Sequence, residues 1–240
     1  MPRRPPRHLK EYHAKSAADL ARGLAAQLAN TLREAIEARG HALLAVSGGK
    51  SPIALFEALR QQSLNWANVS VILVDERCVA HDHADSNTTL VRQHLLQEQA
   101  SVAALTPYFD SLADPLDDAA LDRLVSQANR RLARLHWPID VAVLGMGEDG
   151  HTASLFPDAP GLEKALRNSG PLAWVRPNAA PHARLTLTLP ALLASRELVL
   201  FIGGEAKHTV YRQALLQADP ALPVSLVLHQ HQTPISVWLT

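Results

Sequence analysis

Four short segments of the sequence each carry glycine, a titratable residue, or both. They are Ser47-Gly48-Gly49-Lys50-Ser51, Asp75-Glu76-Arg77-Cys78, Gly145-Met146-Gly147-Glu148-Asp149-Gly150-His151-Thr152 and Gly203-Gly204-Glu205-Ala206-Lys207. Each segment directly follows a short apolar run. Parallel sheets bind ligands at the carboxyl ends of their strands. We therefore expect the four segments to gather around one site.

The first segment has the composition of an anion-binding loop. Gly48 and Gly49 let the backbone approach a ligand closely, and Ser51-Pro52 is typical of a helix N-cap followed by proline at the first helical position. Backbone N–H groups at a helix start attract phosphate. Lys50 adds a positive charge and Ser51 a hydroxyl. The alternative interpretation is a glycine turn that only reverses the chain.

The third segment matches G-x-G-x-x-G, a pattern of dinucleotide-binding loops, but its surroundings disfavour that function. Glu148 and Asp149 would face the pyrophosphate, and no acidic strand end follows about twenty residues later. We expect the glycines to shape a loop that presents His151, because an imidazole accepts and returns protons near neutral pH. The alternative for any of the twelve histidines is an ordinary surface position.

Three further patterns are weaker. The run Ala45-Val46-Ser47-Gly48-Gly49 approximates the nucleophile elbow of serine hydrolases, but the expected helix starts four residues after Ser47 instead of directly after it. His81-Asp82-His83 and His229-Gln230-His231 each offer two metal ligands without a convincing third, so we expect solvated loops and no metal site. Cys78 is expected to be a buried, unreactive thiol.

The elements that position these segments alternate between strands and helices. Helices are expected at 16–39, from 52 onward, at 86–97, 116–135 and 205–216, and strands at 42–46, 69–74, 139–144, 185–189 and 198–202, followed by apolar runs at 224–228 and 235–239. The first helix is the clearest, because Leu20, Leu24 and Leu28 begin a four-residue apolar repeat that ends before Gly40. Continuously apolar strands separated by helices predict an α/β fold with a Rossmann-like, mainly parallel sheet and helices on both faces.

Composition limits the partners and the organisation of the chain. The 240 residues include 23 Lys and Arg against 23 Asp and Glu, and this neutral balance argues against a nucleic-acid partner. A single cysteine favours a cytoplasmic location, and no segment is typical of a secretory signal or a membrane span. We expect a single domain over residues 16–240, an N-terminal tail over 1–15, and a monomer or small homo-oligomer.

Together, several segments resemble the 6-phosphogluconolactonase family. They are Ser47-Gly48-Gly49-x-x-Pro52, Asp75-Glu76-Arg77, Ser86-Asn87, the block from Gly145 to Pro157, and Gly204-x-x-Lys207. They occur in the family's order, and the part from Asp149 to Pro157 is the most specific. One departure is Lys50-Ser51, where the family usually has serine or arginine followed by threonine.

The resemblance implies hydrolysis of 6-phospho-D-glucono-1,5-lactone to 6-phospho-D-gluconate in the oxidative pentose phosphate pathway, without a required cofactor. It also implies the fold shared with glucosamine-6-phosphate deaminase and ribose-5-phosphate isomerase. The family's catalytic histidine falls on His151, which we expect Asp75 or Asp149 to orient. Its substrate- and phosphate-binding positions fall on Ser47, Gly48, Gly49, Lys50, Ser51, Arg77, Arg184 and Lys207.

Two alternative functions use the same fold. A sugar-phosphate isomerase or deaminase would carry a glutamate about five residues after the histidine, where this chain has Phe156. A non-catalytic sugar-phosphate sensor would have no need of His151. The phosphorylated sugar lactone is therefore the small-molecule partner that the sequence favours.

Overall fold

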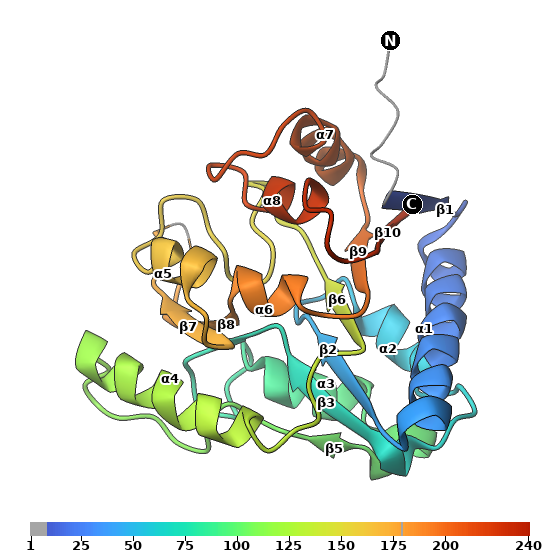
Figure 1. Cartoon of the computed structure of the whole chain (residues 1–240), viewed down its shortest axis with the longest axis horizontal. Coiled ribbons are helices and arrows are strands. Elements are labelled where there is room, and N and C mark those ends of the chain that lie inside the picture. The colour runs from blue at the N-terminus through green and yellow to red at the C-terminus, as the bar shows by residue number, and fades with distance from the viewer. Residues whose placement is uncertain (1–8, 179) are drawn as a thin grey trace.

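A sheet of seven parallel strands forms the centre of the molecule (Figure 1). The computed structural model describes residues 9–178 and 180–240. The strands are β1 (Leu9–His13), β2 (Ala42–Val46), β3 (Val69–Leu73), β5 (Ala104–Leu105), β6 (Val141–Leu144), β9 (Leu198–Ile202) and β10 (Ile235–Leu239). Their order across the sheet is β1-β10-β9-β6-β2-β3-β5, and every pair is parallel. The predicted mainly parallel sheet is thereby confirmed.

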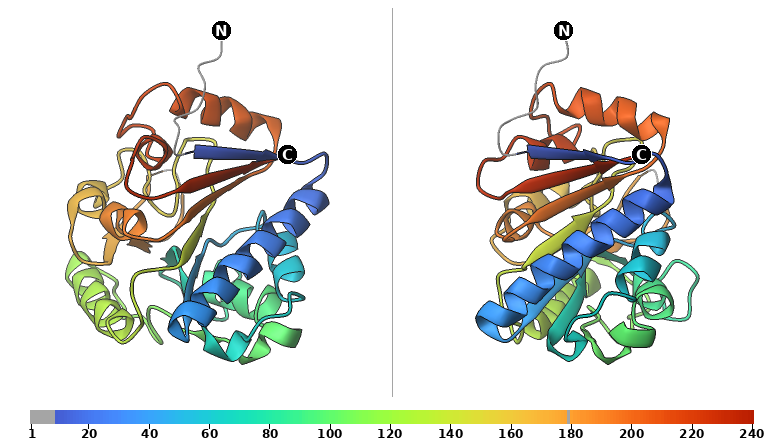
Figure 2. Two further views of the ribbon diagram at one scale, coloured as in Figure 1. Left: turned by 45° about the vertical axis from the view of Figure 1, so that its right-hand side comes forward. Right: turned by 90° about the vertical axis from the view of Figure 1, so that its right-hand side faces the viewer.

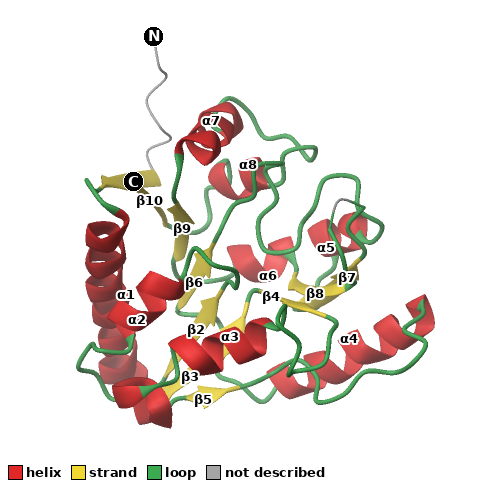
Figure 3. Ribbon diagram, turned by 180° about the vertical axis from the view of Figure 1, so that it is seen from behind, coloured by secondary structure: helices red, strands yellow, loops and turns green. Residues whose placement is uncertain are grey.

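A second sheet of three antiparallel strands stands beside the first (Figure 3). It contains β4 (Asp75–Arg77), β7 (Leu172–Val175) and β8 (Arg184–Leu187), in the order β4-β8-β7. Val74 joins the two sheets, because its N–H donates to the Val46 carbonyl and its own carbonyl accepts from Leu187. The second of the four segments, expected to follow a strand, therefore starts with a strand of its own. The strand predicted at 185–189 is present as β8, but it belongs to this smaller antiparallel sheet and not to the central parallel one. An apolar run predicts a strand without showing which sheet the strand joins.

Helices cover the sheets on both sides. They are α1 (Ala17–Arg39), α2 (Ile53–Leu59), α3 (Asn87–His94), α4 (Asp118–Leu132), α5 (Leu162–Arg167), α6 (Leu189–Leu193), α7 (Glu205–Ala214) and α8 (Val224–Leu228), with 3-10 segments at Trp66–Asn68 and Glu98–Val102. Figure 2 shows α1 lying across the strands of the central sheet. Among the described residues, no helix is long and apolar enough to cross a membrane.

The longest helix has the boundaries that its sequence predicts. The Ser16 hydroxyl accepts from the Asp19 N–H at 3.1 Å, and Gly40 ends the helix in the left-handed conformation at φ 78°. The repeating leucines between them are buried, and Leu24, Leu28 and Leu32 are 0% exposed.

One predicted helix feature is wrong, and one apolar run of open type forms a helix. Helix α2 begins at Ile53 with Pro52 as its N-cap, and no side chain caps it, so Ser51 does not have the predicted capping role. Ser51 is left in the glycine loop, on the side of the ligand pocket described below. The apolar run at 224–228, whose type the sequence left open, forms the short helix α8.

The predicted N-terminal tail is also wrong for residues 9–13, which form the edge strand β1 beside β10. Residues 1–8 lie outside the described part. The ring of Tyr12 stacks on Trp238 at 4.4 Å, and the Tyr211 hydroxyl donates to Glu11 at 2.6 Å. Only Leu9 of this strand is buried, so its sequence carries no apolar run that would have predicted a strand.

Candidate active site

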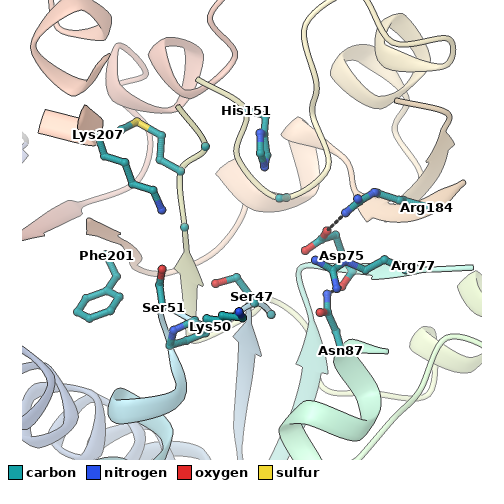
Figure 4. A pocket seen from close by; sticks show the side chains of 17 residues that line it. Ser47, Lys50, Ser51, Asp75, Arg77, Asn87, His151, Arg184, Phe201 and Lys207 are labelled. Atoms are coloured by element: carbon teal, nitrogen blue, oxygen red, sulfur yellow. Dashed lines mark hydrogen bonds and ion pairs between the residues drawn. The ribbon is translucent and has the colours of Figure 1, made fainter. Parts of the chain in front are cut away.

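The four segments meet in one pocket of about 270 Å³ (Figure 4). They follow β2, β3, β6 and β9, which are neighbours in the central sheet, so their carboxyl ends open on the same edge. The predicted site residues that line the pocket are Ser47, Gly48, Gly49, Lys50, Ser51, Asp75, Arg77, His151, Arg184 and Lys207. Asp149 does not line it and contacts His151 instead.

His151 is held in its place by two side chains. Its Nδ1 lies 2.5 Å from Oδ1 of Asp149, and its ring stacks on Phe156 with the centroids 4.0 Å apart and the planes at 22°. The carboxylate fixes the rotation of the ring in its plane, and the phenyl ring fixes the plane itself. Figure 4 shows the imidazole pointing into the pocket.

The protonation of the pair follows from its surroundings. Burial acts to raise the pKa of Asp149, but the hydrogen bond and charge of His151, together with backbone N–H groups, hold that pKa below its ordinary value. The carboxylate is therefore ionised at neutral pH and accepts the Nδ1–H of His151. In the neutral imidazole this arrangement leaves the lone pair on Nε2, which is the atom that a general base requires.

Asp75, the other acidic residue considered for this role, has different partners. Its carboxylate accepts from the Ser154 hydroxyl at 2.6 Å and lies 3.9 Å from Nη1 of Arg184. The side chain is buried, and its backbone carbonyl accepts from Asn87 Nδ2 at 2.9 Å. The structure thus pairs Asp149 with His151 and Asp75 with Arg184, which lies on a different wall of the pocket.

Arg77 and Arg184 form that wall, directly opposite each other on the antiparallel strands β4 and β8. Like charges in such positions repel. Arg77 donates to the Asp85 carbonyl at 2.7 Å, yet within residues 9–178 and 180–240 the buried Nε atoms of both arginines have no hydrogen-bond partner. Burial lowers the pKa of Arg184. An anion bound between the two guanidinium groups would remove the repulsion and satisfy the unused donors.

Lysine side chains approach the pocket from other directions. Lys207 lies in the first turn of α7 and is half-buried, and Figure 4 shows it on the side of the pocket opposite Arg184. Lys50 lines the pocket from the glycine loop but is exposed to solvent. Two arginines and one partly buried lysine therefore give a local positive charge to a chain whose net charge is zero.

Two glycines are required where backbone and side chains approach closely. A Cβ on Gly48 would lie 1.8 Å from Oδ1 of Asn87, and a Cβ on Gly147 would lie 2.2 Å from Nδ1 of His151. Gly147 therefore makes room for the His151–Asp149 pair. This steric requirement explains the glycine-rich segment without a dinucleotide.

Sequence reasoning missed two residues of the site. Asn87, at the first position of α3, lines the pocket, and its buried Oδ1 has no hydrogen-bond partner in the described part of the chain. The Ser86-Asn87 pair had been noted as part of the resemblance, and that was the available signal. Phe156 had been considered only as the position where a deaminase would carry a glutamate. Its ring contacts His151 and lies 5.1 Å from the Arg184 guanidinium.

The weaker sequence patterns have separate outcomes. Cys78 is buried, and burial raises the pKa of its thiol to about 12, so the predicted unreactive cysteine is supported. His81 stacks on Phe109 and bonds to its carbonyl at 2.8 Å. The expectation that His83 has no third ligand group nearby is wrong, because Asp85 and His182 lie beside it.

Comparisons with known proteins show which proteins the chain resembles. A 6-phosphogluconolactonase from Pseudomonas aeruginosa is 46% identical over 207 residues, which cover 85% of this chain and 84% of that protein. The crystal structure of a 6-phosphogluconolactonase from Shewanella baltica superposes with a TM-score of 0.89 at 39% identity and covers 100% of both chains. A monomeric glucosamine-6-phosphate deaminase has the same fold, with a TM-score of 0.75 at 20% identity over 96% of both chains.

The family model of the glucosamine-6-phosphate isomerases and 6-phosphogluconolactonases matches residues 15–237. The match includes every residue that lines the pocket. The fold predicted from the sequence and the family resemblance are both confirmed. The chain belongs to the glucosamine-6-phosphate isomerase/6-phosphogluconolactonase family.

Proposed function

We propose that this chain hydrolyses 6-phospho-D-glucono-1,5-lactone to 6-phospho-D-gluconate, in the oxidative pentose phosphate pathway. The observation that carries the proposal is the pairing, in one pocket, of an oriented imidazole with two opposed arginines that have unused donors. The relatives that share 39% and 46% identity are named as 6-phosphogluconolactonases, which supports the same substrate.

In the proposed reaction, His151 acts first as a base and then as an acid. Its Nε2 takes a proton from water, and the water oxygen bonds to the lactone carbonyl carbon, whose π electrons move to the carbonyl oxygen. The tetrahedral intermediate then collapses, the bond from that carbon to the ring oxygen breaks, and His151 returns its proton to the ring oxygen. The carboxylic acid that results releases its remaining proton to solvent, which gives 6-phospho-D-gluconate. Ionised Asp149 stabilises the imidazolium that exists between the two steps.

The phosphate is distant from the reacting carbon, so its binding positions the lactone in front of His151. We assign this binding to Arg77, Arg184 and Lys207, with the Ser47–Ser51 loop as the neighbouring wall. Each charge-assisted hydrogen bond contributes about 1.5–3 kcal/mol. Three such contacts to one dianion would strongly favour phosphorylated over unphosphorylated gluconolactone.

An isomerase or deaminase reaction is disfavoured at the same pocket. Such chemistry requires a second proton-transfer group beside the histidine, and the position considered for it carries Phe156, which is packed face to face on the imidazole. The ring also occupies the space a carboxylate would need. A non-catalytic sensor would not require the His151–Asp149 pair.

The direct test is hydrolysis of the lactone, generated in situ, compared with its spontaneous rate in buffer. We expect wild-type protein to accelerate the phosphorylated lactone far more than unphosphorylated gluconolactone. Lys207→Ala should raise KM roughly 10- to 150-fold, the equivalent of one charge-assisted hydrogen bond, and the exposed Lys15→Ala should leave KM unchanged. Wild-type protein that is no faster than buffer would refute the proposal.

We further propose that the enzyme is a single-domain cytoplasmic protein, a monomer or small homo-oligomer, that requires no cofactor and binds no nucleic acid. The family match over residues 15–237 supports one domain. The single cysteine supports the location, and the neutral charge balance supports the absence of a nucleic-acid partner.

A further inference from the structure

Two histidines and an aspartate come together outside the pocket, on loops that are far apart in the sequence. His83 and Asp85 lie between β4 and α3, and His182 lies shortly before β8. One nitrogen or oxygen of each side chain lies within 4.8 Å of the others. No other three His, Cys, Asp or Glu side chains within residues 9–178 and 180–240 come this close together.

We propose that His83, Asp85 and His182 bind a divalent transition-metal ion, with Zn²⁺ as the best fit. Two imidazole nitrogens and one carboxylate oxygen suit Zn²⁺, Co²⁺, Ni²⁺ or Cu²⁺, whereas Mg²⁺ and Ca²⁺ prefer oxygen ligands. Three protein ligands leave the fourth tetrahedral position for water or another small ligand.

The geometry is close to that of a bound ion. Tetrahedral Zn²⁺ with bonds of about 2.0–2.1 Å places its ligand atoms about 3.3 Å apart. Asp85 Oδ2 lies 3.0 Å from His182 Nε2 and 3.9 Å from His83 Nδ1, so the two separations lie on either side of this value. The two histidine rings meet edge to face with centroids 5.3 Å apart. The Asp85 N–H donates to His83 Nδ1 at 3.0 Å, so an ion bound at this nitrogen would replace that hydrogen bond.

The ligands are carried on anchored backbone. Arg77 donates to the carbonyl of Asp85 at 2.7 Å, and the N–H of His83 donates to Ala80 at 3.0 Å. Nε2 of His182 lies 3.0 Å from Oδ2 of Asp85, so these two side chains already lie side by side. Ligands held by their own backbone contacts lose little freedom when a metal binds.

The proposal is tested by titrating the chelator-treated full chain with Zn²⁺ by calorimetry, and with Co²⁺ by visible absorption. We expect one ion per chain. Loss of even an outer hydrogen-bond partner weakens metal binding by about 10- to 100-fold, so His182→Ala and Asp85→Asn should each lower the affinity at least about tenfold. Zn²⁺ should also raise the melting temperature of wild type but not of these variants.

Two variants serve as controls. His94 lies 3.4 Å from Glu57 with side-chain exposures of 30% and 48%, which match the 28% and 48% of His182 and Asp85. In the described part of the chain, that pair belongs to no group of three ligand side chains. His94→Ala should bind Zn²⁺ like wild type, and so should His151→Ala, which removes the imidazole of the pocket.

If His182→Ala does not fold, His83→Ala, at an exposed position, provides the same test. Two results would overturn the proposal. One is absence of Zn²⁺ binding by the wild-type chain, which would leave the cluster as a hydrogen-bonded group only. The other is unchanged affinity in the ligand variants, which would place the ion elsewhere.

Discussion

His151 depends on neighbours that fix its ring in two directions. Asp149 holds Nδ1 at 2.5 Å, Phe156 covers one face of the ring, and Gly147 leaves the space that both need. The sequence predicted the histidine but could not choose between Asp75 and Asp149, because both are acidic residues in loops after strands. The choice depends on how the loop after β6 turns back on itself, where the Gly147 N–H donates to the His151 carbonyl.

The two aspartates should affect different kinetic constants. Asp149→Asn should lower kcat about 10²- to 10⁴-fold, because an amide does not hold the imidazole in the required tautomer. Asp75→Asn should mainly raise KM, since its contact is with Arg184 of the phosphate-binding wall. Steady-state kinetics on the lactone separate the two effects. A larger loss of kcat in Asp75→Asn than in Asp149→Asn would contradict this assignment.

Phe156 should act on the rate through the orientation of His151. Phe156→Leu keeps an apolar side chain but removes the stacked ring, which is worth about 0.5–1.5 kcal/mol, so kcat should fall by roughly 2- to 10-fold. Phe109→Leu is the matched control, because Phe109 is buried and stacks on His81 outside the pocket. Equal kcat losses in the two variants would show that the effect is general destabilisation.

Among the elements, those with a clear apolar pattern were predictable from sequence, and those defined mainly by their pairing partners were not. The helix α1 and the strands β2, β3 and β9 lie where apolar spacing and caps predicted them. The strand β1 has one buried residue among five and β4 has only three residues, and their partners β10 and β8 lie far away in the sequence. The four-residue strand β7 was also missed. Because β4 and β8 were not expected to pair, the direct opposition of Arg77 and Arg184 was also beyond sequence reasoning.

The contact between the first loop and α3 makes Gly48 sensitive to any side chain. Gly48→Ala would place a Cβ 1.8 Å from Asn87 Oδ1, and the resulting overpacking should lower the free energy of unfolding by about 1–3 kcal/mol. Gly145→Ala is the matched control, since its nearest neighbour would be Ser47 Oγ at 3.7 Å. Urea denaturation measures both variants. Equal stability of the two would show that Asn87 moves aside without cost.

At the scale of the whole molecule, the fold concentrates positive charge that the composition conceals. The 23 basic and 23 acidic residues cancel, yet Arg77 and Arg184 from the smaller sheet and Lys207 from α7 surround one pocket. The sequence predicted which loops would meet, because the strands before them are parallel. It did not predict the edge strand β1, because the segment Leu9–His13 is mostly polar.

The edge strand β1 should contribute to global stability, although its sequence resembles a tail. Leu9 is 6% exposed, so Leu9→Ala should lower the free energy of unfolding by about 2–5 kcal/mol. The exposed neighbour Lys10 gives the control, and Lys10→Ala should change stability by less than about 0.5 kcal/mol. Thermal and urea unfolding provide the values. A Leu9→Ala variant as stable as wild type would mean that the pairing of β1 with β10 is energetically unimportant.

The central claim is that His151 performs the proton transfers of lactone hydrolysis, and the kcat of His151→Ala tests it most directly. The rate is measured with the phosphorylated lactone generated in situ and corrected for spontaneous hydrolysis, together with the affinity of the variant for 6-phosphogluconate. We predict a loss of about 10²- to 10⁴-fold in kcat with unchanged affinity for the product. A kcat within about twofold of wild type would contradict the assigned role of His151.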